Sequence, residues 1–305
     1  MGINLLYPFQ KSWKKKFYII IRQKDLKLCS RYTKKLDISS FFVCPDPHEF
    51  LLRPNMGMLI LDATYIHRNS LCALVAINEH NQIFWHFARY ESSYNWATFL
   101  SCFGEPQVLV MDGQKGLFAA ARLTWPQVHI QRCQFHVISF ALQYLGRHPK
   151  EEVGKALLHL LYTLKDAKTQ EGRDRWLQAY WQWESYYGQL FSERTKLGVF
   201  QYPRLRSVRF IIRKALPNLF TFLDYPGTPN TTNLVEGWVN SAVAEALRLH
   251  RGLHEYEKKA LVSVVLSHLR RGRTAQDLSK ERAAKAARKK YYFRNRRAKD
   301  RMKSF

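Results

Sequence analysis

Three acidic residues stand apart in a chain that is otherwise strongly basic. Asp62 lies within an apolar stretch, Asp112 ends a second apolar stretch, and Glu236 lies near the start of a helical pattern. A lone carboxylate in a hydrophobic strand is costly to bury unless a partner neutralises it. Divalent hard cations are natural partners because they prefer carboxylate oxygens. The three residues are therefore candidate ligands of a divalent metal.

The overall charge indicates a polyanionic partner. The 305 residues include 49 Lys and Arg against 24 Asp and Glu, which gives a formal net charge of +25. Nucleic acid is the first partner to expect, because neutralising its phosphates releases counterions and drives binding. An anionic membrane surface is the alternative. Metal-binding carboxylates in a protein that holds nucleic acid indicate metal-dependent phosphodiester chemistry.

Other patterns exclude several classes of protein. No apolar run reaches about 18 residues, so the sequence predicts no membrane-spanning helix. The basic cluster from Lys11 to Lys16 is followed by only a short apolar stretch without a cleavage site, so we expect no signal peptide. The five cysteines are scattered and odd in number, which fits a reducing cytoplasm better than a disulfide framework.

Hydrophobic periodicity predicts the elements that must position the acids. It indicates strands at 56–66, 71–78, 82–90, 107–111 and 128–132, and helices at 94–103, 116–123, 133–144, 233–249 and 255–269. The order of these elements predicts an α/β fold. Asp62 is expected on the first strand and Asp112 at the end of the fourth.

Five segments are expected along the chain. They are a basic N-terminal segment at 1–50, the first part of the core at 51–147, a helical insertion at 148–228, core helices carrying Glu236 at 229–270, and a basic tail at 271–305. The insertion is expected to be all-helical, with its aromatic stripe around Trp183 packed in its core. The tail mixes dense Lys and Arg with aromatic residues, which predicts helical structure and contact with nucleic acid.

Each acid also has an ordinary structural interpretation. Asp62 would be unremarkable on an exposed edge strand, although its apolar neighbours favour a strand buried on both faces. Asp112 precedes a glycine, and Asp-Gly is a common turn dipeptide. Asn233-Leu-Val-Glu236 resembles a capping box, in which the fourth side chain bonds back to the first amide.

Cys133 and His136 place two soft metal ligands within one helical turn. A structural zinc site needs four ligands, and no second Cys or His pair lies at a useful spacing. His129 is a third candidate, but it is expected on the preceding strand. We therefore expect Cys133 and His136 to pack and hydrogen-bond close to the carboxylates.

The sequence resembles a known family in several ordered motifs. Met111-Asp-Gly-Gln-Lys-Gly-Leu, Trp125-Pro and Gln131-Arg-Cys-Gln-Phe-His136 resemble the Mutator-like superfamily of DDE transposases, in its bacterial insertion-sequence branch. Asn233-Leu-Val-Glu236-Gly and His250-Arg-Gly-Leu253 resemble the same branch. The resemblance implies a ribonuclease H-like mixed-sheet core, with a helical insertion before the glutamate.

The same resemblance implies a mechanism and partners. Asp62, Asp112 and Glu236 would be the catalytic ligands of two Mg²⁺ ions, with Mn²⁺ as a substitute, and Cys133 and His136 would support the site. The substrate would be double-stranded DNA, cut at transposon ends by hydrolysis and joined to target DNA by strand transfer. The enzyme would act as a homodimer or larger assembly, associated with the nucleoid.

Four basic residues are expected to hold DNA phosphates without reading sequence: Lys115, Arg132, Arg248 and Arg251. Two alternatives to a transposase remain at this point. One is a remnant that binds DNA without cutting it, and the other is a ribonuclease H-like nuclease unrelated to transposition.

Overall fold

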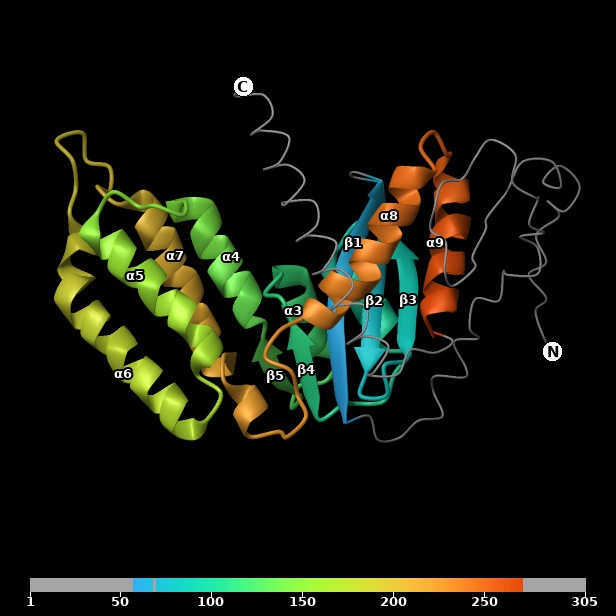
Figure 1. Cartoon of the computed structure of the whole chain (residues 1–305), viewed down its shortest axis with the longest axis horizontal. Helices are drawn as coiled ribbons and strands as arrows, with labels where there is room; N and C mark the ends of the chain where they lie inside the picture. The colour runs from blue at the N-terminus through green and yellow to red at the C-terminus, as the bar shows by residue number, and fades with distance from the viewer. Residues whose placement is uncertain (1–56, 68–69, 271–305) are drawn as a thin grey trace, which may run out of the picture.

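Five strands form one mixed sheet in the computed structural model, which describes residues 57–67 and 70–270 of the chain (Figure 1). The strands are β1 (Met58–His67), β2 (Leu71–Asn78), β3 (Ile83–Ala88), β4 (Val108–Met111) and β5 (His129–Arg132), in the spatial order β3-β2-β1-β4-β5. Strands β1, β2 and β3 pair antiparallel, whereas β4 pairs parallel with both β1 and β5. The α/β class expected from the sequence is confirmed, and β1 and β4 are neighbours.

The helices follow the expected order. They are α2 (Ser93–Leu100), α3 (Lys115–Thr124), α4 (Gln134–Leu145), α5 (Glu152–Thr163), α6 (Gln170–Tyr187), α7 (Pro203–Ala215), the π-helix η7 (Val235–Asn240), α8 (Ser241–Leu249) and α9 (Glu255–Arg270). Short 3-10 turns are η3 (Leu164–Asp166), η4 (Gly188–Ser192), η5 (Leu216–Asn218) and η6 (Thr221–Leu223). The expected helix at 233–249 is confirmed, and its stretch Val235–Asn240 is π-helical. The N-terminal segment at 1–50 and the basic tail at 271–305 lie outside the described residues.

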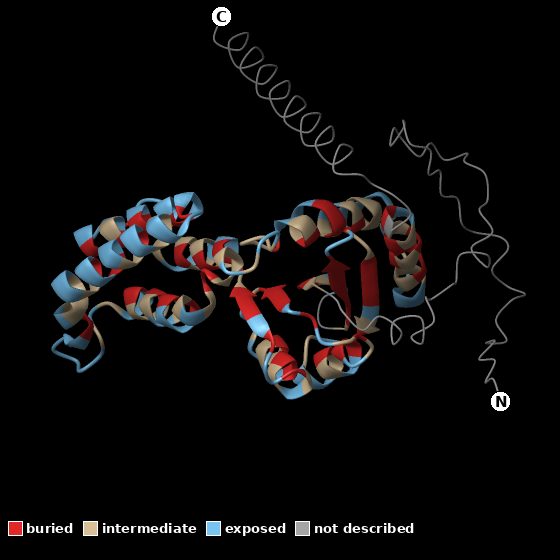
Figure 2. Ribbon diagram, turned by 90° about the horizontal axis from the view of Figure 1, so that it is seen from below, coloured by how far each residue is buried: buried red, intermediate tan, exposed pale blue. Residues whose placement is uncertain are grey.

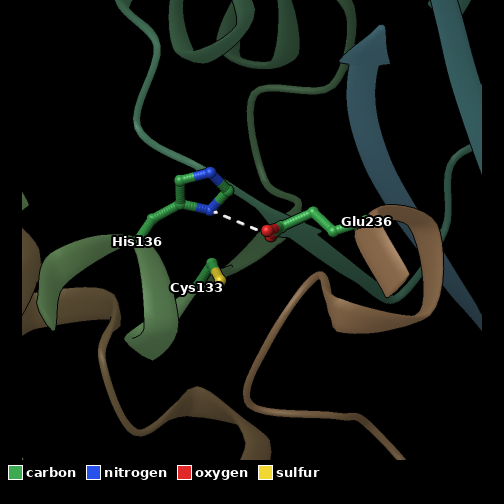
Figure 3. A group of neighbouring side chains, drawn as sticks. All are labelled: Cys133, His136 and Glu236. Carbon is green, nitrogen blue, oxygen red and sulfur yellow. Dashed lines mark ion pairs between the residues drawn. The ribbon is translucent and has the colours of Figure 1, made fainter. Parts of the chain in front are cut away.

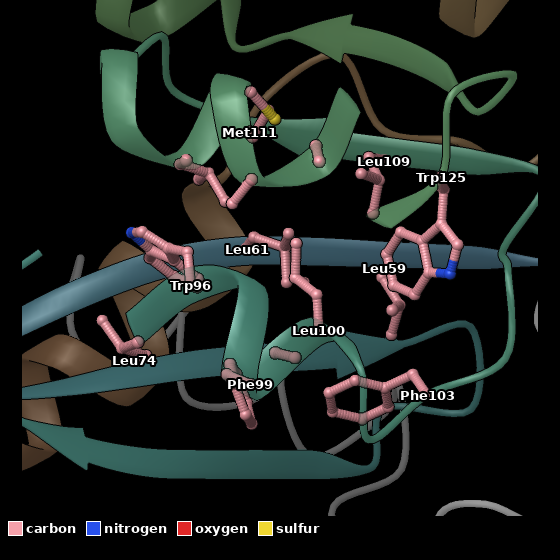
Figure 4. Close-up of a cluster of buried hydrophobic side chains, with 14 of the residues drawn as sticks. Leu59, Leu61, Leu74, Trp96, Phe99, Leu100, Phe103, Leu109, Met111 and Trp125 are labelled. Carbon is pink, nitrogen blue, oxygen red and sulfur yellow. The ribbon is translucent and has the colours of Figure 1, made fainter. Parts of the chain in front are cut away.

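Side-chain alternation along β1 divides the core into two layers. Leu59 and Leu61 pack with α2 and α3 on one face of the sheet, as Figure 4 shows. Ile60 packs on the opposite face with residues of η7, α8 and α9. The sheet is thus covered on both faces (Figure 2). Asp62 has the parity of Ile60, so it belongs to the face covered by η7.

A separate core holds the helices α5, α6 and α7 against α4. The indole nitrogens of Trp176 and Trp183 donate hydrogen bonds to the carbonyl oxygens of Leu160 and Val153, at 2.9 and 3.2 Å. The interpretation of the aromatic stripe as core packing is therefore confirmed. One isolated antiparallel bridge, between Arg194 and Phe200, is an exception to the all-helical expectation for 148–228.

Two buried glutamines attach the end of the helical segment to the sheet. The side-chain nitrogens of Gln131 and Gln134 each donate to the carbonyl oxygen of Leu219, both at 3.0 Å. The side-chain oxygen of Gln131 accepts a hydrogen bond from the backbone N–H of Phe222 at 2.8 Å. The side-chain oxygen of Gln134 accepts one from the side-chain nitrogen of Asn230 at 2.8 Å. These satisfied buried amides hold the returning chain beside β5 and the start of α4.

None of the helices in the described ranges is both long enough and apolar enough to cross a membrane.

The shared core of the helical segment predicts a large difference between two identical substitutions. Leu157 in α5 is completely buried, whereas Leu197 is 89 % exposed. We expect Leu157→Ala to lower the free energy of unfolding by about 2–5 kcal/mol, through lost burial and a cavity. The control Leu197→Ala should change it by less than about 0.5 kcal/mol. Urea denaturation measures both, and equal losses would contradict a packed core in this segment.

Candidate active site

Asp62 lies on a central strand, so the edge-strand interpretation is wrong. β1 is flanked by β2 and β4, and Asp62 is only 9 % exposed. The side-chain amide of Asn240 donates a hydrogen bond to its Oδ2 at 2.9 Å. Burial raises the pKa of Asp62 to about 7; the positive charge of His136 opposes this shift, and the charges of Asp112 and Glu236 reinforce it. The carboxylate therefore lies in a site that disfavours its charge.

Asp112 immediately follows β4, beside the strand that carries Asp62. Leu61 and Met111 are register partners on the parallel strands β1 and β4, and each is followed directly by an aspartate. Asp112 Oδ1 also accepts the backbone N–H of Gln114 at 2.8 Å, so the turn interpretation holds as well. One residue thus ends the strand, forms the turn and brings a second carboxylate beside the first.

Glu236 comes from η7 and is fixed by a hydroxyl group. Thr232 Oγ1 donates to Glu236 Oε1 at 2.6 Å, and His136 Nδ1 lies 3.5 Å from the same oxygen. The amide of Asn233 contacts the Thr231 hydroxyl, so the arrangement is not the capping box that the sequence suggested. The side chain of Glu236 is directed toward the start of α4.

Cys133, His136 and Glu236 form one compact group (Figure 3). One ligand atom from each residue lies within 4.8 Å of the other two. This is the one such group of three or more His, Cys, Asp or Glu among residues 57–67 and 70–270, and it contains neither Asp62 nor Asp112. The structure therefore places Glu236 nearest the cysteine and histidine, with the two aspartates within electrostatic range.

His136 lies close to Glu236 and Asp112, whose negative charges favour its protonated form. Its burial disfavours a charge, but the hydrogen bond with Cys133 and the negative charges of Glu236 and Asp112 outweigh that effect and raise its pKa to about 9. A protonated imidazole at neutral pH offsets part of the carboxylate charge. The supporting role expected for His136 thus has a definite electrostatic form.

Arg132 lies directly against the turn that carries Asp112. A Cβ atom added at Gly113 would lie 1.8 Å from Arg132 Nη1, so a side chain at position 113 would displace the guanidinium. Burial lowers the pKa of Arg132, while the negative charge of Asp112 opposes that shift. Its Nη1 is buried and has no hydrogen-bond partner among the described residues. Arg132 therefore offers an unused donor beside the acids.

The other three expected phosphate ligands are exposed. Lys115 is exposed at the start of α3, in the same turn region as Asp112. Arg248 near the end of α8 hydrogen-bonds Glu245 at 2.6 Å, and Arg251 is exposed just beyond that helix. The structure thus groups Arg132 with the acids and leaves Arg248 engaged with a neighbour on its own helix.

Two important residues were not recognised in the sequence. Thr232 and Asn240 lie four residues before and after Glu236, which is a spacing that shares one helix face. Thr232 orients Glu236, and Asn240 joins Asp62 to the Thr64 hydroxyl. Polar residues four positions before and after Glu236 could have indicated side chains that contact the site.

Glu91 is a third residue that was missed. Burial raises the pKa of its carboxyl group, and the charge of Asp112 contributes to the same shift. The backbone carbonyl of Glu91 accepts a hydrogen bond from the side chain of Gln114 at 3.1 Å. A fourth acid thus lies near Asp112, from a loop with no recognisable motif.

The raised pKa of Asp62 predicts a pH-dependent stability in the metal-free protein. Between its ordinary pKa of 3.8 and about 7, the folded state holds a proton that the unfolded state has lost. The contribution of Asp62 to the free energy of unfolding should therefore fall as the pH rises through this window and level off above it. Asp62→Asn removes this penalty, so its advantage over wild type should grow by about 2 kcal/mol between pH 5 and pH 7.

Urea denaturation of the full chain in chelator, at several pH values, measures this difference. Asp166→Asn is the control, because Asp166 is exposed in η3. An advantage of Asp62→Asn that stays constant from pH 5 to pH 8 would show that Asp62 titrates normally.

Comparison with known proteins supports the relationship suggested by the motifs. A family model described as transposase, Mutator family, matches residues 58–241. The matched region contains the whole sheet, the helices α2 to α7, and the residues Thr232, Glu236 and Asn240. No curated protein matches the chain. Because the family match spans more than half of the 305 residues, the chain belongs to the Mutator family of transposases.

Proposed function

We propose that this transposase cuts transposon ends and joins them to target DNA, with Asp62, Asp112 and Glu236 as its catalytic carboxylates. The observation that carries the proposal is that Asp62 and Asp112 directly follow Leu61 and Met111, which are register partners on the parallel strands β1 and β4. Asp62 is buried, and the charges of both other acids raise its pKa. Such a constellation favours cation binding and perturbed titration, which are properties typical of active sites.

The sheet topology supports a ribonuclease H-like core. Three antiparallel strands are followed by two parallel strands that alternate with helices, in the spatial order β3-β2-β1-β4-β5. In our proposal residues 51–147 and 229–270 make this core, and 148–228 is an insertion between its second and third acids. The buried glutamine contacts with Leu219 support this division, because they return the chain to the sheet.

The donor set fits hard divalent cations. Carboxylates are the ligands that Mg²⁺ takes from proteins, and Mn²⁺ accepts the same ligands. Asp62 and Asp112 would hold the ions, and Glu236 would join them after leaving His136. When bound, two cations supply the charge that activates a water or DNA 3′-hydroxyl and stabilises the leaving oxygen.

The remaining residues orient the acids and the DNA. Asn240 holds the Asp62 carboxylate in one orientation by its hydrogen bond. The guanidinium of Arg132 lies within electrostatic range of Asp112, with one buried nitrogen that lacks a hydrogen-bond partner among the described residues, and we expect its positive charge to attract a DNA phosphate. Lys115, Arg248 and Arg251 would bind phosphates farther along double-stranded DNA. The net charge of +25 supports this substrate, and we expect a homodimer or larger assembly on DNA.

Loss of one carboxylate should abolish the chemistry without abolishing DNA binding. We expect Asp62→Asn to reduce Mg²⁺-dependent cleavage of a duplex bearing the transposon end by roughly 100- to 1000-fold or more, the scale of losing one preorganised electrostatic group. Asp166→Asn should cleave like wild type, because Asp166 is an exposed residue of η3. Denaturing gels measure cleavage, and gel shifts measure binding.

The products of the same assay separate the alternatives. Cleavage followed by joining to target DNA supports a transposase, whereas cleavage alone supports a nuclease. Binding by wild type without any Mg²⁺- or Mn²⁺-dependent cleavage would support a remnant. Equal cleavage by wild type and Asp62→Asn would sink the proposed carboxylate site.

A further inference from the structure

Glu236 belongs to two different sets of metal ligands. One set is the pair of aspartates, which contains only oxygen donors. The other set is Cys133 and His136, whose sulfur and nitrogen atoms lie within 4.8 Å of the glutamate oxygen. We propose that Cys133, His136 and Glu236 form a binding site for a soft divalent cation such as Zn²⁺, and that its occupation keeps Glu236 from joining the aspartates. The second clause rests on the proposed function, whereas the first does not.

The distances suit a small tetrahedral ion. Zinc bonds of about 2.3 Å to sulfur and 2.0–2.2 Å to nitrogen and oxygen put neighbouring ligand atoms roughly 3–4 Å apart. His136 Nδ1 and Glu236 Oε1 are 3.5 Å apart in the structure. The Thr232 hydroxyl lies 2.6 Å from Glu236 Oε1, 3.3 Å from Cys133 Sγ and 3.4 Å from His136 Nδ1, so all three ligand atoms lie around this one hydroxyl.

The ligands are held before any ion binds. Cys133 is fully buried immediately before α4, and its backbone N–H donates to the carbonyl oxygen of Met111 at 2.8 Å. The next amide, that of Gln134, donates to the Asn230 carbonyl at 2.9 Å. Thr232 donates its N–H to Cys133 Sγ at 3.3 Å and its hydroxyl to Glu236. These contacts tie α4 and η7 together across about 100 residues of sequence.

The donor chemistry selects the class of ion. Magnesium takes oxygen ligands and keeps much of its water, so a sulfur and an imidazole offer it little. Zinc and cobalt accept thiolate, imidazole and carboxylate in one site. Three protein ligands with a fourth position open to water are sufficient for zinc. The sequence showed no second Cys or His pair at a useful spacing, and the fold instead supplies Glu236, which lies 100 residues after His136.

Competition follows from the sharing of one carboxylate. A zinc ion bound to Cys133 and His136 would hold Glu236 on the α4 side of the site. The set of three acids proposed for Mg²⁺ would then be incomplete while Asp62 and Asp112 stay in place. The geometry therefore predicts that a soft cation inhibits a reaction that a hard cation supports.

Cobalt is a direct probe of the site, because its absorption spectrum reports ligand type and geometry. Titrating the metal-free full chain with Co²⁺ should give a sulfur-to-cobalt charge-transfer band and tetrahedral visible bands that saturate at one equivalent and disappear on adding Zn²⁺. Cys133→Ser should lose the sulfur band. Cys102→Ser is the matched control, because Cys102 lies just after α2, where its thiol donates a hydrogen bond to the Thr98 carbonyl oxygen at 3.6 Å.

Two further measurements guard against a variant that fails to fold. Near-ultraviolet circular dichroism compares each variant with wild type. Glu236→Gln keeps an acceptor for Thr232 but removes the anionic ligand, so it should retain the sulfur band only at higher Co²⁺ concentration. A wild-type spectrum without a sulfur band, or an unchanged band in folded Cys133→Ser, would overturn the site.

Cleavage assays test the competition separately. One equivalent of Zn²⁺ should inhibit Mg²⁺-dependent cleavage by wild type, and a zinc chelator should restore it. If zinc binds through Cys133 but leaves cleavage unchanged, the competition is refuted and the binding site stands. If wild type shows no cleavage with Mg²⁺ or Mn²⁺, the proposed function and the competition fall together, while the cobalt spectrum still decides the site.

Discussion

The burial of a carboxylate inside an apolar sheet is the constraint on which the rest of this structure depends. Asp62 is on a central strand, where burial alone makes its charge unfavourable. The fold compensates with a hydrogen bond from Asn240, the positive charge of His136 and the proximity of Arg132 to Asp112. Each of these groups comes from a different element, so the sheet, α4 and η7 must assemble together for the acid to be tolerated.

The assembly is achieved by polar contacts within an apolar framework. Gln131 and Gln134 hold the chain where it returns from the helical segment, and Thr232 then contacts both Cys133 and Glu236. The π-helix η7 follows at once and ends at Asn240, which reaches Asp62. π-helical turns are rare and frequently occur at functional sites. The π-helix η7 therefore does two things. Its last residue, Asn240, orients Asp62 on the sheet, and its own residue Glu236 is a second acid.

Periodicity predicted the strands and most helices because their burial follows the local pattern of side chains. Asp62 stood out because an acid among Leu59, Ile60 and Leu61 violates that pattern. The contact of Glu236 with His136 had no such signal, since it depends on how the chain returns after the helical segment. The π-helix was also missed, because 233–249 has an ordinary helical pattern. The contacts of Thr232 with Glu236 and of Asn240 with Asp62 depend on the three-dimensional position of η7, which the sequence pattern does not indicate.

Glu236 links the proposed hard-cation site of the aspartates with the proposed soft-cation site of Cys133 and His136. In the described structure its carboxylate is stabilised by the Thr232 hydroxyl and the positively charged His136, not by the aspartates. A hard cation between the acids would compete with these contacts for the same oxygen. A soft cation would replace the proton of His136, which binds metal only as the neutral imidazole, and would hold Glu236 beside Cys133 and His136. The cysteine and histidine therefore set the free energy that a hard cation must overcome to recruit the third acid. In the proposed active site, recruitment of Glu236 would then depend on two residues that need not touch the DNA.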